Sequence, residues 1–513
     1  MLKKITIFIF ISLLASCVSV KTHNQKRETQ VSAEKLREDV DFAYTKLQKL
    51  HPNLYWYISK DSLDYKFDSL KTTIHRPLKP NEFYQKLAPV VAKVRQGHLR
   101  LYPYEKRLTK KEIKDLKNQK GLLSRYNFVL DNDRIFVKDN SEKVPNMEVG
   151  TEILKIKDIP VKDLLQKYKP FVNSDGYNQT FQKYSMARRW PAFFTAEFGI
   201  LDSVKVEAKL NNKIKTFYLN REKITKDEKK LEETANKKIT KSEKGKVKDY
   251  NILTKSYNRD LQFPTKDSTI AYMKIKTFSG TYSRKFYKQS FAALKKSPAK
   301  YLILDIRDNL GGSLSEINNL YSYLALEKFQ FIGDIEITSL SSMFQADYLS
   351  NFSLITKPVG IVAYPFYLIA TALSTKKADD KFYLRNNNMF AIKNPKKTNF
   401  KGKIYVLMNG SSFSAASILP SKLKDERRAF LVGEETGGAN DGTVAGRYST
   451  EKLKSSKLYL PIGLMLIQPD IDFTDTKKGV LPDQEIIPSL QEILQKKDVQ
   501  LDWVMKEIKK ENP

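Results

Sequence analysis

The stretch IYVLMNGSSFSAASILPSKLKDERRAFLVGEETGGANDGTVAG, residues 404–446, decides the fold of this chain. It begins with a short apolar run, Ile404–Met408, of the kind that forms a buried strand. Asn409 and Gly410 interrupt that run, and an amphipathic segment with Ile418, Leu419 and Leu423 at helical spacing follows, before a second apolar run at 429–432. The stretch therefore predicts a strand, a helix and a second strand in succession.

Ser414 lies where the first predicted strand gives way to the helix. A serine at such a turn exposes its hydroxyl, and the free backbone N–H groups of the first helical turn point at any oxyanion formed beside it. A serine in this place can also do nothing more than cap the helix. The stretch alone leaves both interpretations open.

The same pattern occurs upstream, where apolar strands at Ile270–Ile275 and Tyr301–Ile306 flank a helix predicted over Arg284–Lys295. Strands that alternate with helices predict an α/β core with a largely parallel sheet. Gly311 and Gly312 follow the second strand and leave backbone N–H groups bare for close approach by a ligand. A phosphate could use such a turn, but neither GxxxxGK[ST] nor GxGxxG is present, so nucleotide binding is the weaker interpretation.

The helix that follows Gly312 is predicted to begin with a capping box formed by Ser313 and Glu316.

Length and charge narrow the class of protein. A chain of 513 residues with 41% hydrophobic residues is long enough for several domains with sizeable cores. Its formal net charge of +32 would suit nucleic acid or an anionic membrane surface. The charge is spread along the whole chain, mostly as lysine, and no nucleic-acid module is recognisable. We therefore expect a lysine-rich surface and no nucleic-acid partner.

The N-terminus predicts export. Met1–Lys4 is basic, Ile5–Leu14 is mostly apolar and too short to span a bilayer, and the run ends at Cys17, the one cysteine of the chain. This resembles a bacterial lipoprotein signal, residues 1–17, whose cleavage leaves a lipid-modified cysteine; an ordinary export signal is the alternative. Residues 18–31 are predicted to be a polar tether, and a single cysteine permits no disulfide within the chain.

An N-terminal helical region is predicted for residues 32–110. Apolar stripes at helical spacing predict three helices, at about 36–50, 63–74 and 83–94, the last one closed by Gly97. His98 follows at once and begins HLRLYPY, whose alternation predicts a half-buried strand. A histidine at such a corner is held in position, although a surface or capping role is equally open.

The middle of the chain is predicted to contain a β-rich domain and then a charged insertion. Residues 121–221 contain short alternating runs typical of strands. Residues 150–168 resemble a PDZ domain, which captures peptides by strand addition, because they contain in order a glycine, a strand, a tight turn, a second strand and a helix. A generic β-rich domain fits nearly as well. Residues 222–264 are dominated by Lys and Glu and are predicted to be a charged insertion that carries no chemistry, before a core at 265–513.

These residues supply the parts of an acyl-transfer site: Ser414 as nucleophile, His98 as general base and backbone donors for an oxyanion. With four histidines, one cysteine and no HExxH motif, a zinc enzyme is poorly supported, and no cofactor is expected. His51, which precedes a proline in an aromatic-rich turn, is expected to pack rather than to catalyse.

Four motifs resemble the tail-specific, or C-terminal processing, serine peptidases, particularly their tricorn-like branch. They are LILDIRDNLGG at 302–312, NGSSFSAAS at 409–417, GEETGG at 433–438 and GVLPD at 479–483. The resemblance implies an α/β fold: a ClpP/crotonase-like catalytic core with an N-terminal helical region and a β-rich PDZ-like domain.

The same resemblance implies site residues. Ser414 falls on the nucleophile, His98 on the base of the tricorn-like members, and the backbone of Ala415 with that of Gly311 or Gly312 on the oxyanion hole. Ala439 stands where the processing-type members carry a lysine base, so a Ser–His pair is expected. The candidate for the third member is an acid, Asp475, with Asp472 behind it. Pro420 and Ser417 depart from the family's pattern and leave the geometry open.

The predicted function is an exported serine endopeptidase, lipid-anchored in the bacterial cell envelope on a periplasm-facing membrane, that hydrolyses envelope polypeptides. The alternative is a peptide-binding lipoprotein that keeps the fold without turnover. A third interpretation, polyanion binding through the net charge, predicts steep salt dependence of association.

Overall fold

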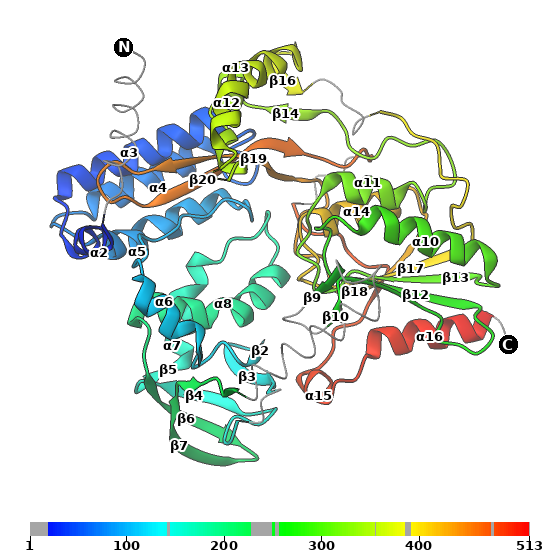
Figure 1. The fold of residues 1–513 in the computed structure, drawn as a ribbon, viewed down its shortest axis with the longest axis horizontal. Coiled ribbons are helices and arrows are strands. Elements are labelled where there is room, and N and C mark those ends of the chain that lie inside the picture. Colours follow the sequence, from blue (N-terminus) through cyan, green and yellow to red (C-terminus); the bar gives the residue numbers. More distant parts are fainter. Residues whose placement is uncertain are drawn as a thin grey trace.

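The α/β core is built on a six-stranded sheet with the order β11-β12-β13-β17-β18-β21 (Figure 1). The computed structural model describes residues 19–140, 144–226, 249–251, 256–353, 355–384, 391–472 and 477–511. The strands of this sheet are β11 (Arg259–Gln262), β12 (Ile270–Ile275), β13 (Tyr301–Asp305), β17 (Lys403–Met408), β18 (Phe430–Gly433) and β21 (Gln484–Glu485). All neighbours from β12 to β21 are parallel, whereas β11 is antiparallel to β12. The predicted α/β fold with a largely parallel sheet is confirmed.

Helices cover both faces of this sheet. Alternate residues of β13 show the division, because Leu302 and Leu304 belong to the main hydrophobic core while Tyr301 and Ile303 pack in a second cluster. The first face carries α10 (Ser283–Lys296), α11 (Leu314–Tyr321) and α14 (Ala415–Asp425), and the second carries α16 (Val499–Glu511) (Figure 1). Burial on both faces explains why the core strands are apolar along their whole length.

The core begins earlier than predicted, inside the segment assigned to a charged insertion. Arg259 opens β11, and its buried guanidinium pairs with Asp249 at 2.5 Å and Glu316 at 2.7 Å. Glu316 is therefore committed to Arg259, and the predicted capping box is only half formed: Ser313 Oγ accepts from the Glu316 N–H at 3.4 Å. Part of the Lys/Glu-rich insertion, residues 227–248 and 252–255, lies outside the described residues.

A second sheet connects the core to the N-terminal helices. Its order is β15-β16-β14-β20-β19, and the long hairpin of β19 and β20 lies along α3 (Figure 1). Its strands are β14 (Ile335–Ile337), β15 (Thr375–Ala378), β16 (Lys381–Leu384), β19 (Thr443–Lys452) and β20 (Tyr459–Ile467). Asp39, on α3, accepts hydrogen bonds from the backbone N–H groups of Ser455 and Ser456 at the hairpin tip. This contact fixes the hairpin against the helical region.

The middle of the chain forms a third, antiparallel sheet with the order β2-β3-β4-β6-β7, with β5 paired to β4. Its elements are β2 (Asn127–Asp131), β3 (Arg134–Asp139), β4 (Glu152–Ile156), β5 (Ile159–Pro160), α7 (Val161–Tyr168), β6 (Ser203–Leu210) and β7 (Lys213–Asn220). The β-rich texture is as predicted, but the 19-residue helix α8 (Thr180–Phe198) within it was not predicted. That helix matters, because one of its faces lines the candidate site.

The N-terminal helices are α2 (Val20–Glu28), α3 (Ala33–Leu50), α4 (Lys60–Thr72) and α5 (Pro80–Val91), followed by the 3-10 turn η1 (Ala92–Val94). The prediction of a polar tether at 18–31 is wrong for α2, because His23 is buried there and bonds to the Glu105 carbonyl at 2.9 Å. Further along lie α6 (Lys110–Lys117) and a small ribbon of β1 (Gln119–Lys120) with β8 (Glu222–Lys223). Among the described helices, none combines the length and apolar character needed to cross a bilayer.

The corner that carries His98 differs from the prediction in two ways. Gly97 was predicted to end the helix, but the residue in the left-handed conformation at the helix end is Arg95, with φ 57°. Gly97 is required instead by close packing. A Cβ atom on Gly97 would lie 2.6 Å from Cζ of Phe413. The segment after His98 is extended with a single bridge, Tyr102 to Tyr459, rather than a strand, although Leu99 and Leu101 are buried as the alternation predicted.

Candidate active site

Ser414 sits at a strained turn between β17 and α14. Its backbone has φ 58° and ψ −123°, a conformation that costs a non-glycine residue on the order of 1–3 kcal/mol. Such a turn projects a side chain out of the protein at the start of a helix. The N–H groups of Ala416 and Ser417 bond to the carbonyls of Phe413 and Ser414, whereas the Ala415 N–H has no hydrogen-bond partner among the described residues. A bare donor therefore lies next to the Ser414 hydroxyl.

The ends of β13 and β17 are joined by side-chain amides, which fixes the turn. Asn409 Oδ1 accepts from the N–H groups of Asp308 and Ser411, and its Nδ2 donates to the Asp308 carboxylate at 3.1 Å. Asn309 accepts from the Phe413 N–H through its carbonyl and donates to the Ile275 carbonyl through its side chain. The carboxyl ends of neighbouring parallel strands meet here, which is where open α/β sheets bind ligands.

The two glycines after β13 occupy different places. Gly311, with φ 94°, packs against the Ser414 turn so closely that a Cβ atom would lie 2.8 Å from Ser414 Cβ and 2.9 Å from the Ala415 nitrogen. Its N–H donates to Asn309 Oδ1 at 2.9 Å. The Gly312 N–H has no hydrogen-bond partner in the described part of the chain. Of the two predicted donors, Gly312 is thus the one left unused.

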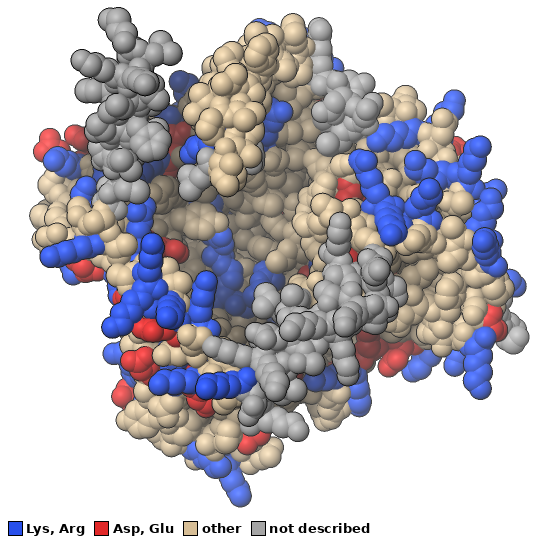
Figure 2. Space-filling model, in the orientation of Figure 1, with Lys and Arg blue, Asp and Glu red and all other residues tan. Residues whose placement is uncertain are grey.

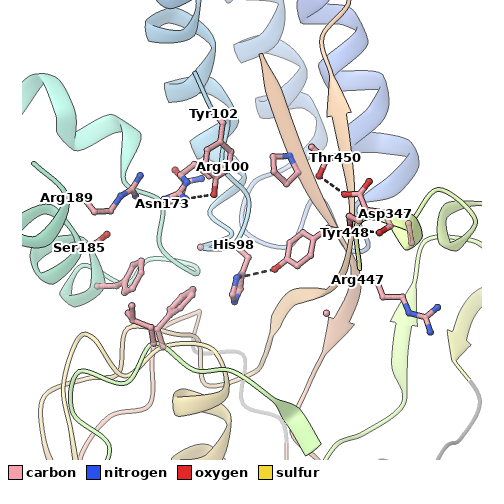
Figure 3. A pocket seen from close by; sticks show the side chains of 18 of the residues that line it. His98, Arg100, Tyr102, Asn173, Ser185, Arg189, Asp347, Arg447, Tyr448 and Thr450 are labelled. Carbon is pink, nitrogen blue, oxygen red and sulfur yellow. Dashed lines mark hydrogen bonds between the residues drawn. The ribbon is translucent and has the colours of Figure 1, made fainter. Parts of the chain in front are cut away.

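His98 lies beside the residue that precedes Ser414. Its ring and that of Phe413 have centroids 4.9 Å apart, and its Nδ1 is 3.3 Å from the Tyr448 hydroxyl (Figure 3). Its Nε2 is shielded from solvent and has no hydrogen-bond partner among the described residues. The structure therefore brings the predicted base to the loop that carries Ser414, without a direct hydrogen bond between His98 and Ser414.

The surroundings of His98 keep its imidazole neutral. Burial lowers the pKa of His98 to about 4, and the positive charge of Arg100 acts in the same direction. A histidine must be neutral to accept a proton, so near pH 7 this side chain is in the form that a general base requires. Tyr448 stays protonated, because burial raises its pKa to about 12.

Asp175 and Tyr448 are site residues that the sequence reasoning missed. The buried carboxylate of Asp175 accepts from the Gly97 N–H at 2.7 Å and from the Ala439 N–H at 3.4 Å. It thereby ties the His98 corner to the loop after β18, and burial raises its pKa to about 6. Both residues come from segments distant in sequence from the residue they support, so no local pattern marked them.

The remaining predicted residues fall as follows. Asp475 and Cys17 lie outside the described residues, and the other candidate acid, Asp472, is exposed, with its N–H bonded to Asp425. Ser417 Oγ donates to the Ser414 carbonyl at 2.8 Å, and Pro420 is accommodated inside α14, which is buried along most of its length rather than amphipathic. Ala439 is buried next to this turn, and no lysine stands at that position.

A cavity of about 680 Å³ opens beside these groups. It is lined by His98, by Leu310 and Phe413 from the two turns, and by aromatic and basic side chains from α8, β19 and the segment at 346–350. Figure 2 shows the hollow at the centre of this face, and Figure 3 shows the side chains that converge on it. A pocket of this size can hold several residues of an extended peptide, and Phe413, the residue before Ser414, lines it.

Comparison with known proteins identifies the core. Residues 269–486 match the model of a family described as peptidase family S41. The core belongs to peptidase family S41. The matched residues include β12, β13, β17 and β18 with both glycine-containing turns and Ser414, which confirms the family recognised in the sequence. The chain is a serine-type peptidase.

Solved structures share the fold of this chain. Mature CPAF superposes with a TM-score of 0.60 at 15% identity, covering 90% of this chain and 94% of that one. Mature CPAF complexed with lactacystin gives 0.61 at 15% identity, over 93% and 98% of the two chains. The photosystem II D1 C-terminal processing protease covers 90% of this chain and 96% of its own at 14% identity, with a TM-score of 0.41. No curated protein matches in sequence.

Proposed function

We propose that this S41 peptidase cleaves polypeptides through an acyl-enzyme formed on Ser414, with His98 as the general base. The observation that carries the proposal is the backbone of Ser414, held at φ 58° beside the bare N–H of Ala415. Strain of this kind persists only where the surrounding structure imposes it, and it collects at reactive positions.

The chemistry follows from the groups around the cavity. Ser414 Oγ attacks the scissile carbonyl carbon while His98 Nε2 takes its proton, and the carbonyl oxygen becomes an oxyanion that accepts from the N–H groups of Ala415 and Gly312. The imidazolium then returns the proton to the leaving amine. Water attacks the acyl-enzyme by the reverse sequence and releases the second product.

The base must be the correct tautomer for this sequence. Nε2 can accept the serine proton only if the ring proton is on Nδ1, and Nδ1–H then donates to the Tyr448 oxygen. Tyr448 would thus orient the ring in place of an acid, while Asp175 holds the backbone of the same corner. The position of Asp475 as third member remains a prediction.

A purified protein tests the proposal directly. We expect the wild type to cleave an unfolded polypeptide, and Ser414→Ala and His98→Ala to lower kcat by several orders of magnitude. His75→Ala is the matched control for His98, because His75 is exposed and lies outside the cavity. A folded wild type that binds peptides without cleaving them would favour the alternative, a peptide-binding protein of the same fold.

We also propose that the peptidase is exported and anchored by a lipid on Cys17, so that its substrates are envelope polypeptides. The support is the leader at residues 1–17. Cys17→Ser should move the protein from the membrane fraction to the soluble fraction. A wild type found in the soluble fraction with Cys17 unmodified would contradict this part of the proposal.

A further inference from the structure

The helix α13 (Lys357–Leu373) presents an apolar face to solvent. Figure 1 shows it at the top of the molecule, at the outer edge of the second sheet, and the same place in Figure 2 is a tan projection. Its residues from Pro358 to Leu373 carry no charge. Six large apolar side chains along it are between 57% and 74% exposed: Val359, Ile361, Val362, Phe366, Ile369 and Leu373. An exposed apolar patch of this extent on a soluble surface marks a site of interaction.

The two faces of α13 are separated by helical spacing. Residues three or four apart pack on the protein and form the inner face: Gly360, Tyr364, Tyr367 and Thr371. The hydroxyls of Tyr364 and Tyr367 donate to the backbone carbonyls of residues 344 and 343 at 3.2 and 3.4 Å. A second set with the same spacing points outward, and we call it the outer stripe: Val362, Phe366, Ile369 and Leu373. The outer stripe contains no polar side chain.

The inner face of α13 borders the cavity. Tyr367 lines the cavity, its ring stacks on that of Tyr348 at 4.4 Å, and the guanidinium of Arg447 lies 5.3 Å from its ring centroid. Tyr348 and Arg447 line the cavity as well. One helix therefore has the cavity on its inner side and an uncovered apolar stripe on its outer side.

The dimensions of α13 argue against a second copy of the chain as the partner. A helix of 17 residues is about 25 Å long and about 10 Å wide, so its outer face offers on the order of 250 Å² of contact. A stable protein–protein interface needs about 800 Å² from each partner. A lipid surface has no such requirement, because acyl chains adapt to whatever apolar surface enters them.

The ends of α13 also suit a lipid surface. Lys357 begins the helix, and Lys376 and Lys377 follow its end, where long cationic side chains can reach headgroups while their stems lie in apolar surroundings. Lys376 pairs with Asp334 at 2.5 Å and Lys377 with Asp380 at 3.1 Å, so attraction by charge is small here and docking depends on the outer stripe. A helix of this length is too short to span a bilayer and would lie in its interface.

We propose that α13 docks on a lipid surface, with its axis along that surface and the outer stripe inserted at the boundary of the acyl chains. This docking is independent of the peptidase mechanism and of a lipid on Cys17. Because the inner face of α13 borders the cavity, docking places the cavity beside the membrane. The substrates are then polypeptides held at a membrane surface, a consequence that rests on the proposed function.

A fluorescent label on the outer stripe tests the docking. The full chain with Cys17→Ser and Val362→Cys has one thiol, which is labelled with an environment-sensitive nitrobenzoxadiazole probe. Vesicles of phosphatidylcholine carry no net charge, so the lysine-rich surface of the protein adds no attraction. We expect the emission to shift to shorter wavelength when vesicles are added, and the shift to persist at high salt. The same label at Tyr65→Cys, an equally exposed position on α4, should not respond.

A matched pair of variants tests the contribution of the stripe. In the chain labelled at position 362, Phe366→Ser should raise the vesicle concentration at half-maximal shift by about tenfold, because one Phe side chain no longer enters the apolar layer. Tyr65→Ser is the control, since Phe366 and Tyr65 are both 71% exposed and neither change should disturb the fold. Unaltered circular dichroism checks that both variants are folded.

The substrate class has its own measurement. A peptide tethered to vesicles by a lipid should be cleaved about tenfold faster than the same peptide free in solution, and Phe366→Ser should remove most of that ratio. Equal rates for the tethered and free peptides would overturn the substrate class.

Other occupants of the outer stripe give different results. A shift at position 362 that grows with protein concentration in the absence of vesicles would show that a second copy covers it. A shift caused by an unfolded polypeptide and not by vesicles would show that a protein segment does. Either result, or no shift at all, would overturn the docking. If soluble peptide is still cleaved then, the mechanism stands; if the label shifts but Ser414 takes no fluorophosphonate, the mechanism is wrong and the docking stands.

Discussion

Replacing Gly311 with alanine should damage the active site more than its fold. At φ 94° an added Cβ costs about 1–2 kcal/mol in backbone strain. The same Cβ would lie 2.7 Å from the Phe413 carbonyl oxygen, 2.8 Å from Ser414 Cβ and 2.9 Å from the Ala415 nitrogen. Overpacking of this kind costs about 1–3 kcal/mol more. We therefore expect Gly311→Ala to lower the free energy of unfolding by about 2–5 kcal/mol.

The three atoms crowded by that Cβ belong to the nucleophile turn, so relief of the clash must move Ser414 or the bare donor beside it. A displacement near 1 Å costs about 100-fold in rate. Gly199→Ala is the matched control: Gly199 has φ 82°, but its Cβ would meet nothing within 4 Å. Unfolding by denaturant and kcat/KM for one peptide measure both variants. If the folded Gly311→Ala enzyme is as active as Gly199→Ala, the placement of Gly311 against a catalytic turn is wrong.

Three further predictions use the same site and core. Burial lowers the pKa of His98 to about 4 and raises that of Asp175 to about 6, so kcat/KM should fall near pH 4 because of His98, separately from any change near pH 6 due to Asp175. A profile with no inflection near pH 4 would mean that the histidine is solvated. Tyr448→Phe should lower kcat by roughly tenfold with little change in KM, because it removes one hydrogen bond that orients the His98 ring. Tyr104→Phe is the control: it removes a similar tyrosine–histidine bond outside the cavity and should leave kcat unchanged. Arg259→Met should lower the free energy of unfolding by about 3–5 kcal/mol, because it leaves a buried carboxylate without its partner. Adding Glu316→Leu should recover part of that loss. Equal losses in the single and double variants would refute the pairing.

The parts of the site that follow directly on core strands could be predicted from sequence. Ser414 and Gly311 stand at the ends of apolar runs, and a strand followed by small residues and a helix marks such turns locally. The position of His98 after a helix could also be predicted, but its role as base came only from the family resemblance, and the prediction that Gly97 ends the helix is wrong. Arg95 ends the helix, and Gly97 is fixed by the ring of Phe413, a contact that spacing along the chain does not contain.

The supporting residues could not be predicted in the same way. Tyr448 lies 350 residues from His98 in sequence, and it reaches the ring because the β19–β20 hairpin runs back to the N-terminal helices. Arg189, which lines the cavity, lies in α8. The aromatic and charged residues of α8 do not form a clear apolar stripe at helical spacing, so the helix was not predicted. Such partners are brought together by tertiary packing, which overrides local preference.

The central claim is that Ser414 is an activated nucleophile, and labelling with a fluorophosphonate tests it most directly. The account predicts a single covalent adduct on Ser414 in the wild type, lost in Ser414→Ala, formed far more slowly in His98→Ala and unchanged in His75→Ala. A folded wild type that takes no label, or a Ser414→Ala variant that takes it as fast as the wild type, would contradict the claim.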